Sequence, residues 1–269
     1  MLPHWTEGKV NVNGSELHYV RTGAGEKPAL VLAHGFSDHG LCWLPVARDL
    51  EAHYDLILPD ARGHGHSGRV QPGDEIDLAA DLAGVIHALA LSRPIVGGHS
   101  MGADTTAQME ARFSGLARAL VLEDPPWFDP QPPKEPPAPR PAMADWIVNL
   151  KKLSEAEMIA KCRADSPTWP EVELQPWAES KRLFDLNFTQ GFRRPQPFWT
   201  EVVAALHAPT LLITADPGKG AIVTPQAAQA AAALNPVVRV VNIAGAGHSI
   251  RRENFSDYMA ALQEFLLSV

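Results

Sequence analysis

The sequence lacks any run of about 18 apolar residues, so it predicts no helix that spans a membrane. It has no excess of positive charge: 23 Lys and Arg residues face 31 Asp and Glu, and the net charge of −8 argues against nucleic acid as a partner. Its two cysteines are too few for a disulfide framework. The N-terminal segment has no apolar stretch typical of a signal peptide. These absences favour a cytoplasmic, enzyme-sized globular protein with neither a membrane nor a nucleic acid as partner.

Short apolar runs alternate with helical patterns over most of the chain. A hairpin is predicted first, around the Asn13-Gly14 turn, because apolar residues alternate on both sides of it. Continuous apolar runs follow, which suit strands buried on both faces. This alternation predicts an α/β protein with a mostly parallel sheet flanked by helices. The predicted strands lie at 28–34, 54–59, 94–98, 119–123, 209–214 and 237–241, and the predicted helices at 41–50, 74–91, 101–113, 225–234 and 255–267.

A proline-rich segment interrupts this alternation. Nine of the 17 residues from Pro125 to Pro141 are proline, a density that neither a helix nor a central strand tolerates. Helical patterns near 143–164 and 175–190 follow it, separated by a Ser-Pro-Thr-Trp-Pro sequence at 166–170. We therefore expect an α/β core in two parts, 1–125 and 206–269, with a helical insertion at 126–205.

The strongest chemical signal is a G-x-S-x-G sequence from Gly98 to Gly102, with Ser100 at its centre. It lies between a predicted strand and a predicted helix, which is the context that a nucleophile elbow requires. The small residues on either side let neighbouring backbone approach closely, and the serine hydroxyl then projects above the carboxyl edge of the sheet. Ser100 is therefore the candidate nucleophile.

A serine hydroxyl needs a base at neutral pH, and His248 is the candidate. It lies in a glycine-rich loop just after the last predicted strand, and it follows Ser100 in chain order. The developing oxyanion needs fixed donors, for which we expect the backbone N–H groups of Phe36 and Met101. His34 and Gly35 precede Phe36 at the end of a predicted strand, and we expect them to contact substrate.

Four motifs together resemble the α/β-hydrolase superfamily: HGF at 34–36, DARGHGHSG at 60–68, GHSMG at 98–102 and GAGHSIRRE at 245–253. The resemblance covers both parts of the core. It implies an α/β-hydrolase fold with a mostly parallel eight-stranded sheet, a helical cap inserted after the sixth strand, and serine hydrolase activity without a cofactor. The elements at 122–127 and 166–170 are similar to those of N-formylmaleamate deformylase-like hydrolases.

The acid of the expected triad has two candidates. The family usually places it in the loop after the seventh strand, but here the usual position holds Gly218, which cannot orient an imidazole. Asp216 lies two residues earlier and could substitute if the turn at 217–218 redirects it. Asp124 lies at the end of the sixth strand, where the deformylase-like members carry the acid, and we favour it. Either residue would orient the histidine and stabilise its imidazolium form.

The predicted insertion is rich in aromatic residues, and we expect some of them to line an apolar substrate pocket between the cap and the sheet. Trp127, Trp146 and Trp169 are the candidates for substrate contact. His64 and His66 form an H-x-H pair, but no further ligands with suitable spacing accompany them, so no metal site is predicted.

The sequence therefore predicts a carboxylic ester hydrolase of the carboxylesterase type that forms an acyl-enzyme on Ser100. An amidohydrolase or deformylase acting on a small amide and a C–C bond hydrolase are the enzymatic alternatives, since all three use the same triad. A ligand receptor on a hydrolase scaffold is the alternative outside enzymes. The expected partner is a small-molecule ester or amide, and the chain is expected to be a monomer or a homodimer.

Overall fold

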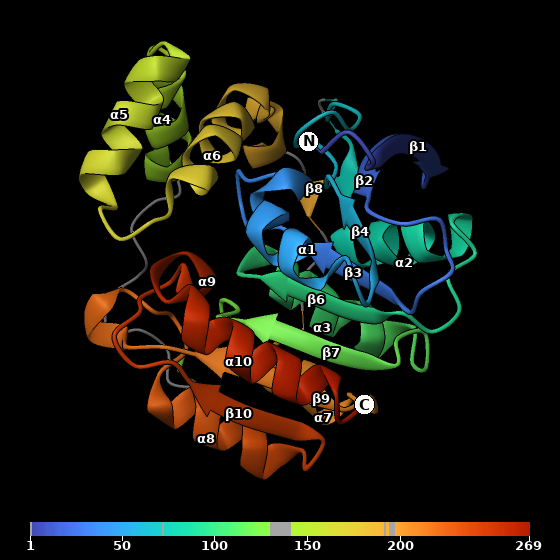
Figure 1. Cartoon of the computed structure of the whole chain (residues 1–269). Coiled ribbons are helices and arrows are strands. Elements are labelled where there is room, and N and C mark those ends of the chain that lie inside the picture. Colours follow the sequence, from blue (N-terminus) through green and yellow to red (C-terminus); the bar gives the residue numbers. More distant parts are fainter. Residues whose placement is uncertain (1, 72, 130–140, 191, 194–196) are drawn as a thin grey trace.

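A computed structural model describes residues 2–71, 73–129, 141–190, 192–193 and 197–269. An eight-stranded sheet runs through the centre of the molecule in the order β1-β2-β4-β3-β6-β7-β9-β10 (Figure 1). The strand β2 is antiparallel to both of its neighbours, and all other neighbours are parallel. This confirms the predicted mostly parallel sheet. The strands are β1 (Thr6–Val12), β2 (Ser15–Arg21), β3 (Ala29–Ala33), β4 (Asp55–Pro59), β6 (Ile95–His99), β7 (Ala119–Glu123), β9 (Thr210–Thr214) and β10 (Val238–Asn242).

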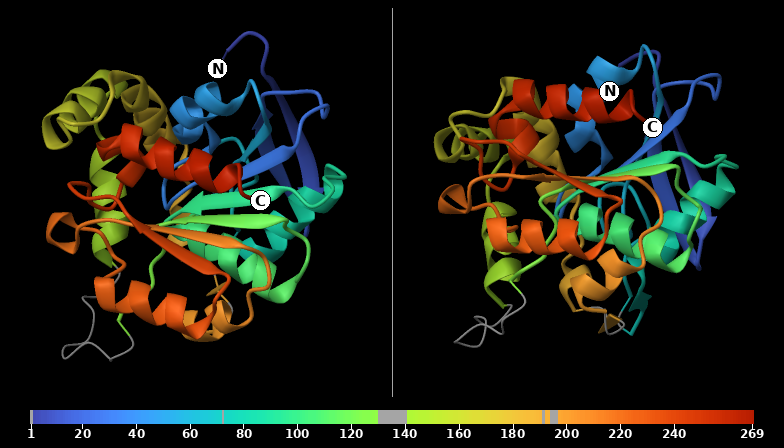
Figure 2. Two further views of the ribbon diagram at one scale, coloured as in Figure 1. Left: turned by 60° about the horizontal axis from the view of Figure 1, so that its bottom comes forward. Right: turned by 90° about the horizontal axis from the view of Figure 1, so that it is seen from below.

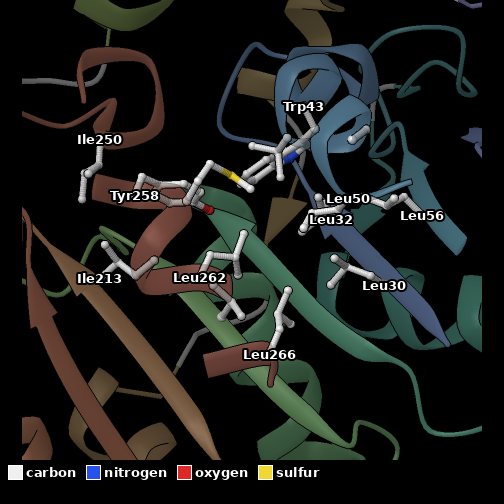
Figure 3. Close-up of a cluster of buried hydrophobic side chains, with 14 of the residues drawn as sticks. Leu30, Leu32, Trp43, Leu50, Leu56, Ile213, Ile250, Tyr258, Leu262 and Leu266 are labelled. Atoms are coloured by element: carbon white, nitrogen blue, oxygen red, sulfur yellow. The ribbon is translucent and has the colours of Figure 1, made fainter. Parts of the chain in front are cut away.

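Helices cover both faces of the sheet (Figures 1 and 2). One face packs against α1 (Leu44–Leu50), α9 (Ile250–Glu253) and α10 (Phe255–Leu266), and the other against α2 (Leu78–Ala88), α3 (Met101–Arg112), α7 (Trp199–Ala204) and α8 (Pro225–Leu234). Figure 3 shows the first interface, where Leu30 and Leu32 of β3 lie among side chains of α1 and α10. Both leucines are at most 1 % exposed, and burying each stabilises the fold by roughly 1.5–3 kcal/mol.

Four of the predicted helical segments differ from the observed elements by more than one residue. The segment 41–50 divides into a 3₁₀ turn at 40–43 and α1, and the pattern at 175–190 corresponds to a helix at 171–183 followed by a 3₁₀ turn at 186–189. The helix predicted over 74–91 begins only at Leu78, because the Asp77 side chain accepts a hydrogen bond from the Ala80 N–H at 3.0 Å and caps it. The two residues before the cap form β5 (Glu75–Ile76), which pairs in parallel with β8 (Phe192–Arg193). The pattern predicted over 143–164 divides into α4 (Pro141–Leu150) and α5 (Glu155–Asp165), because a capping box between Ser154 and Glu157 starts a new helix.

The chain between β7 and β9 carries α4, α5, α6 (Glu171–Leu183), the 3₁₀ turn η2 (Leu186–Thr189), β8 and α7. In Figure 1, α4–α6 lie beyond the end of the sheet toward which β6 and β7 point. The helix α6 contacts both α1 and the 3₁₀ turn η1 (Gly40–Trp43) that precedes it. The predicted extended proline-rich segment lies for the most part outside the described residues, at 130–140.

Candidate active site

Ser100 occupies a sharp turn between β6 and α3. Its φ of 53° and ψ of −116° lie in a region that non-glycine residues rarely adopt, at a cost on the order of 1–3 kcal/mol. The glycines two positions away make this turn possible. A Cβ on Gly98 would lie 2.3 Å from the backbone of Gly102, and a Cβ on Gly102 would lie 2.3 Å from the Ala33 carbonyl oxygen. The spacing of the motif therefore follows from direct backbone contact between α3, β6 and β3.

His248 and Asp124 form a close pair. The distance from His248 Nδ1 to Asp124 Oδ2 is 2.6 Å. Asp124 is fully buried at the end of β7, and its carboxylate also accepts hydrogen bonds from the backbone N–H groups of Ile222 at 2.8 Å and Val223 at 2.9 Å. Because a carboxylate only accepts, Nδ1 of His248 donates, and Nε2 of the neutral ring is left as an acceptor. That is the tautomer in which a histidine can remove a proton from a serine.

Asp216, the other candidate acid, lies elsewhere. Its carboxylate accepts a hydrogen bond from the Gly245 N–H at 2.8 Å, and its own N–H donates to the Ala246 carbonyl at 3.0 Å. These bonds fasten the loop that carries His248 but do not involve the imidazole ring. The turn η3 (Pro217–Lys219) starts directly after Asp216. The Asp216 side chain therefore lies at the start of this turn, bonded to the backbone of Gly245.

The loop 243–249, which carries His248 and is called the base loop below, also contacts His99, the residue before Ser100. His99 Nε2 lies 2.9 Å from the His248 carbonyl oxygen, and the two imidazole rings lie 4.7 Å apart, centroid to centroid. The Ser100 N–H donates to the Glu123 carbonyl at 2.8 Å, one residue before Asp124. The structure thus gathers the nucleophile, base and acid candidates at the carboxyl ends of neighbouring strands.

The two expected oxyanion donors come from the residue after Ser100 and from the loop after β3. Met101 is the first residue of α3, and the N–H groups of a first helical turn have no partner within the helix. The loop 34–38 after β3 carries Phe36. In this loop the Asp38 N–H donates to the Gly35 carbonyl at 3.1 Å and the Ser37 N–H to His64 Nε2 at 3.3 Å. Among the described residues, the Phe36 N–H has no such acceptor.

Two buried histidines fix the loop 34–38 in place. The Ala61 N–H donates to His34 Nε2 at 2.9 Å, and His34 Nδ1 lies 2.8 Å from the Gly35 carbonyl oxygen. Burial lowers the pKa of His34 and holds that of His64 well below its ordinary value, so both rings are neutral at physiological pH. The contact of His34 and Gly35 with substrate stays a prediction, and the hydrogen bonds seen here shape the loop that carries Phe36.

An apolar cluster lies beside the elbow. Phe36 and Met101 pack against side chains from β5, from the loop before it and from the segment between β7 and β9. The ring of Phe36 lies 5.1 Å from that of Phe184 and 6.2 Å from that of Phe188. Sequence reasoning did not single out these two phenylalanines, and only their aromatic character marked them. We call this group the elbow cluster: Phe36, Val70, Ile76, Leu78, Met101, Ile147, Phe184, Leu186 and Phe188.

The three tryptophans expected at the substrate have other partners. Trp127 stacks on Trp199 at 5.6 Å and donates from Nε1 to Asp104 at 3.1 Å. Trp146 is 43 % exposed, and Trp169 packs over the guanidinium group of Arg252 at 4.5 Å. The structure therefore places Phe184 and Phe188, rather than these tryptophans, against Phe36.

A buried ion-pair network joins α6 to the site. Asp38 binds Lys181 Nζ at 2.7 Å and Arg252 Nη2 at 3.1 Å, and Arg252 Nε donates to Glu173 at 3.0 Å. Burial alone would raise the pKa of Asp38, but the charges of Arg252 and Lys181 outweigh it and keep this pKa well below its ordinary value. The network links α6, the loop 34–38 and α9, which follows His248. We call it the Asp38 network.

Within the described ranges, no group of three or more His, Cys, Asp and Glu side chains could bind a metal ion. None of the helices described there has the length and apolar character needed to cross a bilayer.

The chain is similar along most of its length to known hydrolases. The chain is 29 % identical over 270 residues to N-formylmaleamate deformylase from Pseudomonas putida, and the match covers 96 % of both proteins. Many solved structures share the fold, and two of them illustrate the similarity. One is a deformylase of N-formylmaleamic acid from the same species, with a TM-score of 0.78, 24 % identity and coverage of 96 % of this chain and 100 % of that one. The other is a Rhodococcus esterase, with a TM-score of 0.77, 23 % identity and coverage of 98 % and 99 %.

A family model for the alpha/beta hydrolase family matches residues 30–261, which is most of the chain. The match includes the elbow, the base loop and the loop 34–38. The chain therefore belongs to the alpha/beta hydrolase family.

Proposed function

We propose that the chain hydrolyses carboxylic esters through an acyl-enzyme on Ser100. One observation carries the proposal: His248, paired at 2.6 Å with the buried carboxylate of Asp124, lies against the residue that precedes a strained serine. A strained elbow together with a base in a fixed tautomer is what acyl transfer by serine requires. Backbone strain and a buried carboxylate both cost stability, and the chemistry accounts for why they occur together here.

Each residue has a defined role in the proposed reaction. Nε2 of His248 removes the Ser100 hydroxyl proton as Oγ attacks the carbonyl carbon, and the N–H groups of Phe36 and Met101 donate to the oxyanion. Asp124 stabilises the imidazolium that forms. His248 then gives its proton to the leaving oxygen, the alcohol departs, and the acyl group remains on Ser100. A water molecule that loses a proton to His248 attacks this ester, and His248 returns that proton to Ser100 Oγ as the carboxylic acid leaves.

A second candidate is hydrolysis of a small amide, such as removal of a formyl group from nitrogen. It is favoured by the deformylase that matches 96 % of the chain. The steps are the same, except that His248 protonates a nitrogen, which is the poorer leaving group. The two candidates differ in the bond that is cleaved and not in the residues that cleave it.

The segment 126–205 is proposed to act as the cap of the site. Its residues Ile147, Phe184, Leu186 and Phe188 complete the elbow cluster, whose other members come from the core. A pocket bounded by such side chains favours an apolar acyl or alcohol group of small to medium size. The triad and oxyanion donors require no cofactor.

Labelling with a fluorophosphonate probe tests the proposal. Mass spectrometry of wild-type protein should find the adduct on Ser100, and Ser100→Ala should abolish both the adduct and turnover of a p-nitrophenyl ester. Ser114→Ala, which changes an exposed serine after α3, should keep both. An unlabelled Ser100 in folded wild-type protein would favour a ligand receptor. A panel of esters, formamides and aryl amides then separates the two candidate bonds by kcat/KM.

A further inference from the structure

His99 lies immediately before Ser100 at the end of β6, and its side chain is buried. The proposed reaction assigns it no proton to transfer. The site consists of the Ser100 elbow, the base loop and the loop 34–38, and the ring of His99 contacts both of these loops. One contact is with the base loop at His248, and the other is with the loop 34–38 at Gly35.

The contact with the base loop is directional. The His248 carbonyl oxygen can only accept a hydrogen bond, so the His99 nitrogen 2.9 Å from it, Nε2, carries the proton and donates. In the neutral ring, Nδ1 then has no proton, and within the described residues this buried atom has no hydrogen-bond partner. Burial is the main reason why the pKa of His99 lies well below its ordinary value, and the neighbouring His248 and Arg251 lower it further. This lowered pKa agrees with a neutral ring.

The contact with Gly35 is steric. A Cβ built on Gly35 would lie 2.7 Å from His99 Nδ1 and 3.3 Å from Cε1, so the edge of the ring lies directly against the glycine. The face of the same ring packs on the imidazole of His248 at 4.7 Å and an interplanar angle of 43°. One rigid ring thus spans the distance between the proposed base and the loop that carries Phe36.

We infer that His99 is a positioning residue, whose Nε2–H donation to the His248 carbonyl sets the place of the base relative to Ser100. The inference rests on the proposed function, in which His248 is the base. Asp124 orients the ring of His248 through Nδ1, and His99 fixes the backbone of the same residue. A reacting group that is misplaced by about 1 Å can lose on the order of 10²-fold in rate.

Two substitutions separate the donor from the bulk of the side chain. His99→Gln can place an amide N–H near the position of Nε2, whereas His99→Leu fills similar space without a donor. We expect His99→Leu to lower kcat for p-nitrophenyl acetate by about 10- to 100-fold, and the rate of fluorophosphonate labelling at Ser100 by a similar factor. KM should change by less than about threefold, and His99→Gln should recover most of the loss. Ile95→Val, at the opposite end of the same strand, is the control. It should lower the stability of the fold slightly and leave kcat at the wild-type value.

The outcomes decide between distinct claims. A folded His99→Leu variant with wild-type kcat would overturn the inference while leaving Ser100 and His248 in their roles. Equal losses in the Gln and Leu variants would also overturn it, because the donor would then not matter. If His99→Leu does not fold, His99→Asn replaces it, since its shorter amide does not reach the carbonyl; wild-type kcat in that variant again contradicts the inference. Wild-type protein without an adduct on Ser100 would instead remove the proposed function, and the inference with it.

Discussion

Replacing Asp124 by Asn should remove most of the activity while leaving the fold intact. The carboxylate accepts from His248 Nδ1 and from two backbone N–H groups, of Ile222 and Val223. In Asp124→Asn the amide oxygen can still accept from the backbone, which turns the NH₂ group toward the imidazole. Nδ1 of His248 must then accept, so its proton moves to Nε2, and the ring can no longer take a proton from Ser100.

The expected loss follows from this change of tautomer. A wrong tautomer in a serine triad costs on the order of 10⁴-fold in kcat, which corresponds to about 5.4 kcal/mol of activation free energy. KM should change little, because Asp124 is fully buried and not exposed to substrate. The assay is steady-state hydrolysis of a p-nitrophenyl ester, with circular dichroism to confirm folding.

Asp216→Asn is the matched control, since it also changes a carboxylate that binds the base loop. We expect less than about a tenfold loss of kcat, because its partner is the Gly245 N–H and not the imidazole. A folded Asp124→Asn variant that keeps a tenth or more of wild-type kcat would refute this assignment of the acid. A larger loss in Asp216→Asn than in Asp124→Asn would refute it as well.

Three further predictions concern the scaffold. Gly98→Ala should lower the thermal unfolding temperature and abolish ester turnover, because its Cβ would lie 2.3 Å from the Gly102 backbone; a soluble, active variant would show that the contact can relax. Asp38→Asn should lower the free energy of unfolding in urea by about 3–5 kcal/mol, because it leaves the buried Lys181 and Arg252 without their shared charged partner. A decrease of less than about 1 kcal/mol would argue against a structural role of the Asp38 network. Four histidines (34, 39, 64 and 99) have pKa values lowered chiefly by burial, so below about pH 6.5 the unfolded chain binds more protons at these positions than the folded chain does. The raised pKa of His18 acts in the opposite direction at one position, so the free energy of unfolding should fall as the pH is lowered from 7.5 to 5. A free energy of unfolding that stays constant or rises over this range would contradict the neutral assignments.

The sequence predicted those parts of the fold that depend on local chemistry. The Asn13-Gly14 turn joins β1 to β2 with positive φ at both residues, 47° and 75°, as a two-residue hairpin of this composition should. The helix α8 has the predicted bounds because Thr224 caps it and Pro225 begins it. The elbow was recognisable because its constraint, two glycines around a serine, lies within five residues.

Features that join distant segments could not be read in this way. The pairing of β5 with β8 brings together residues more than one hundred positions apart, and nothing in the sequence near Glu75 indicates it. The choice between Asp124 and Asp216 depends on where the turn after β9 leaves Asp216, which only the three-dimensional course of the chain decides. The Asp38 network likewise takes its charges from three separate segments.

The hydrogen bond of His99 is another feature that joins distant segments. From the sequence it is only the variable position before the serine. The hydrogen bond to the His248 carbonyl appears only once the base loop is folded over the end of β6. Residues of this kind carry no motif of their own, so geometry is needed to find them.

The most direct test of the central claim is a crystal structure of the protein after reaction with a fluorophosphonate. The account predicts phosphorus bonded to Ser100 Oγ, with the phosphoryl oxygen about 2.7–3.1 Å from the backbone nitrogens of both Phe36 and Met101. An adduct on another residue, or a phosphoryl oxygen remote from both nitrogens, would contradict it.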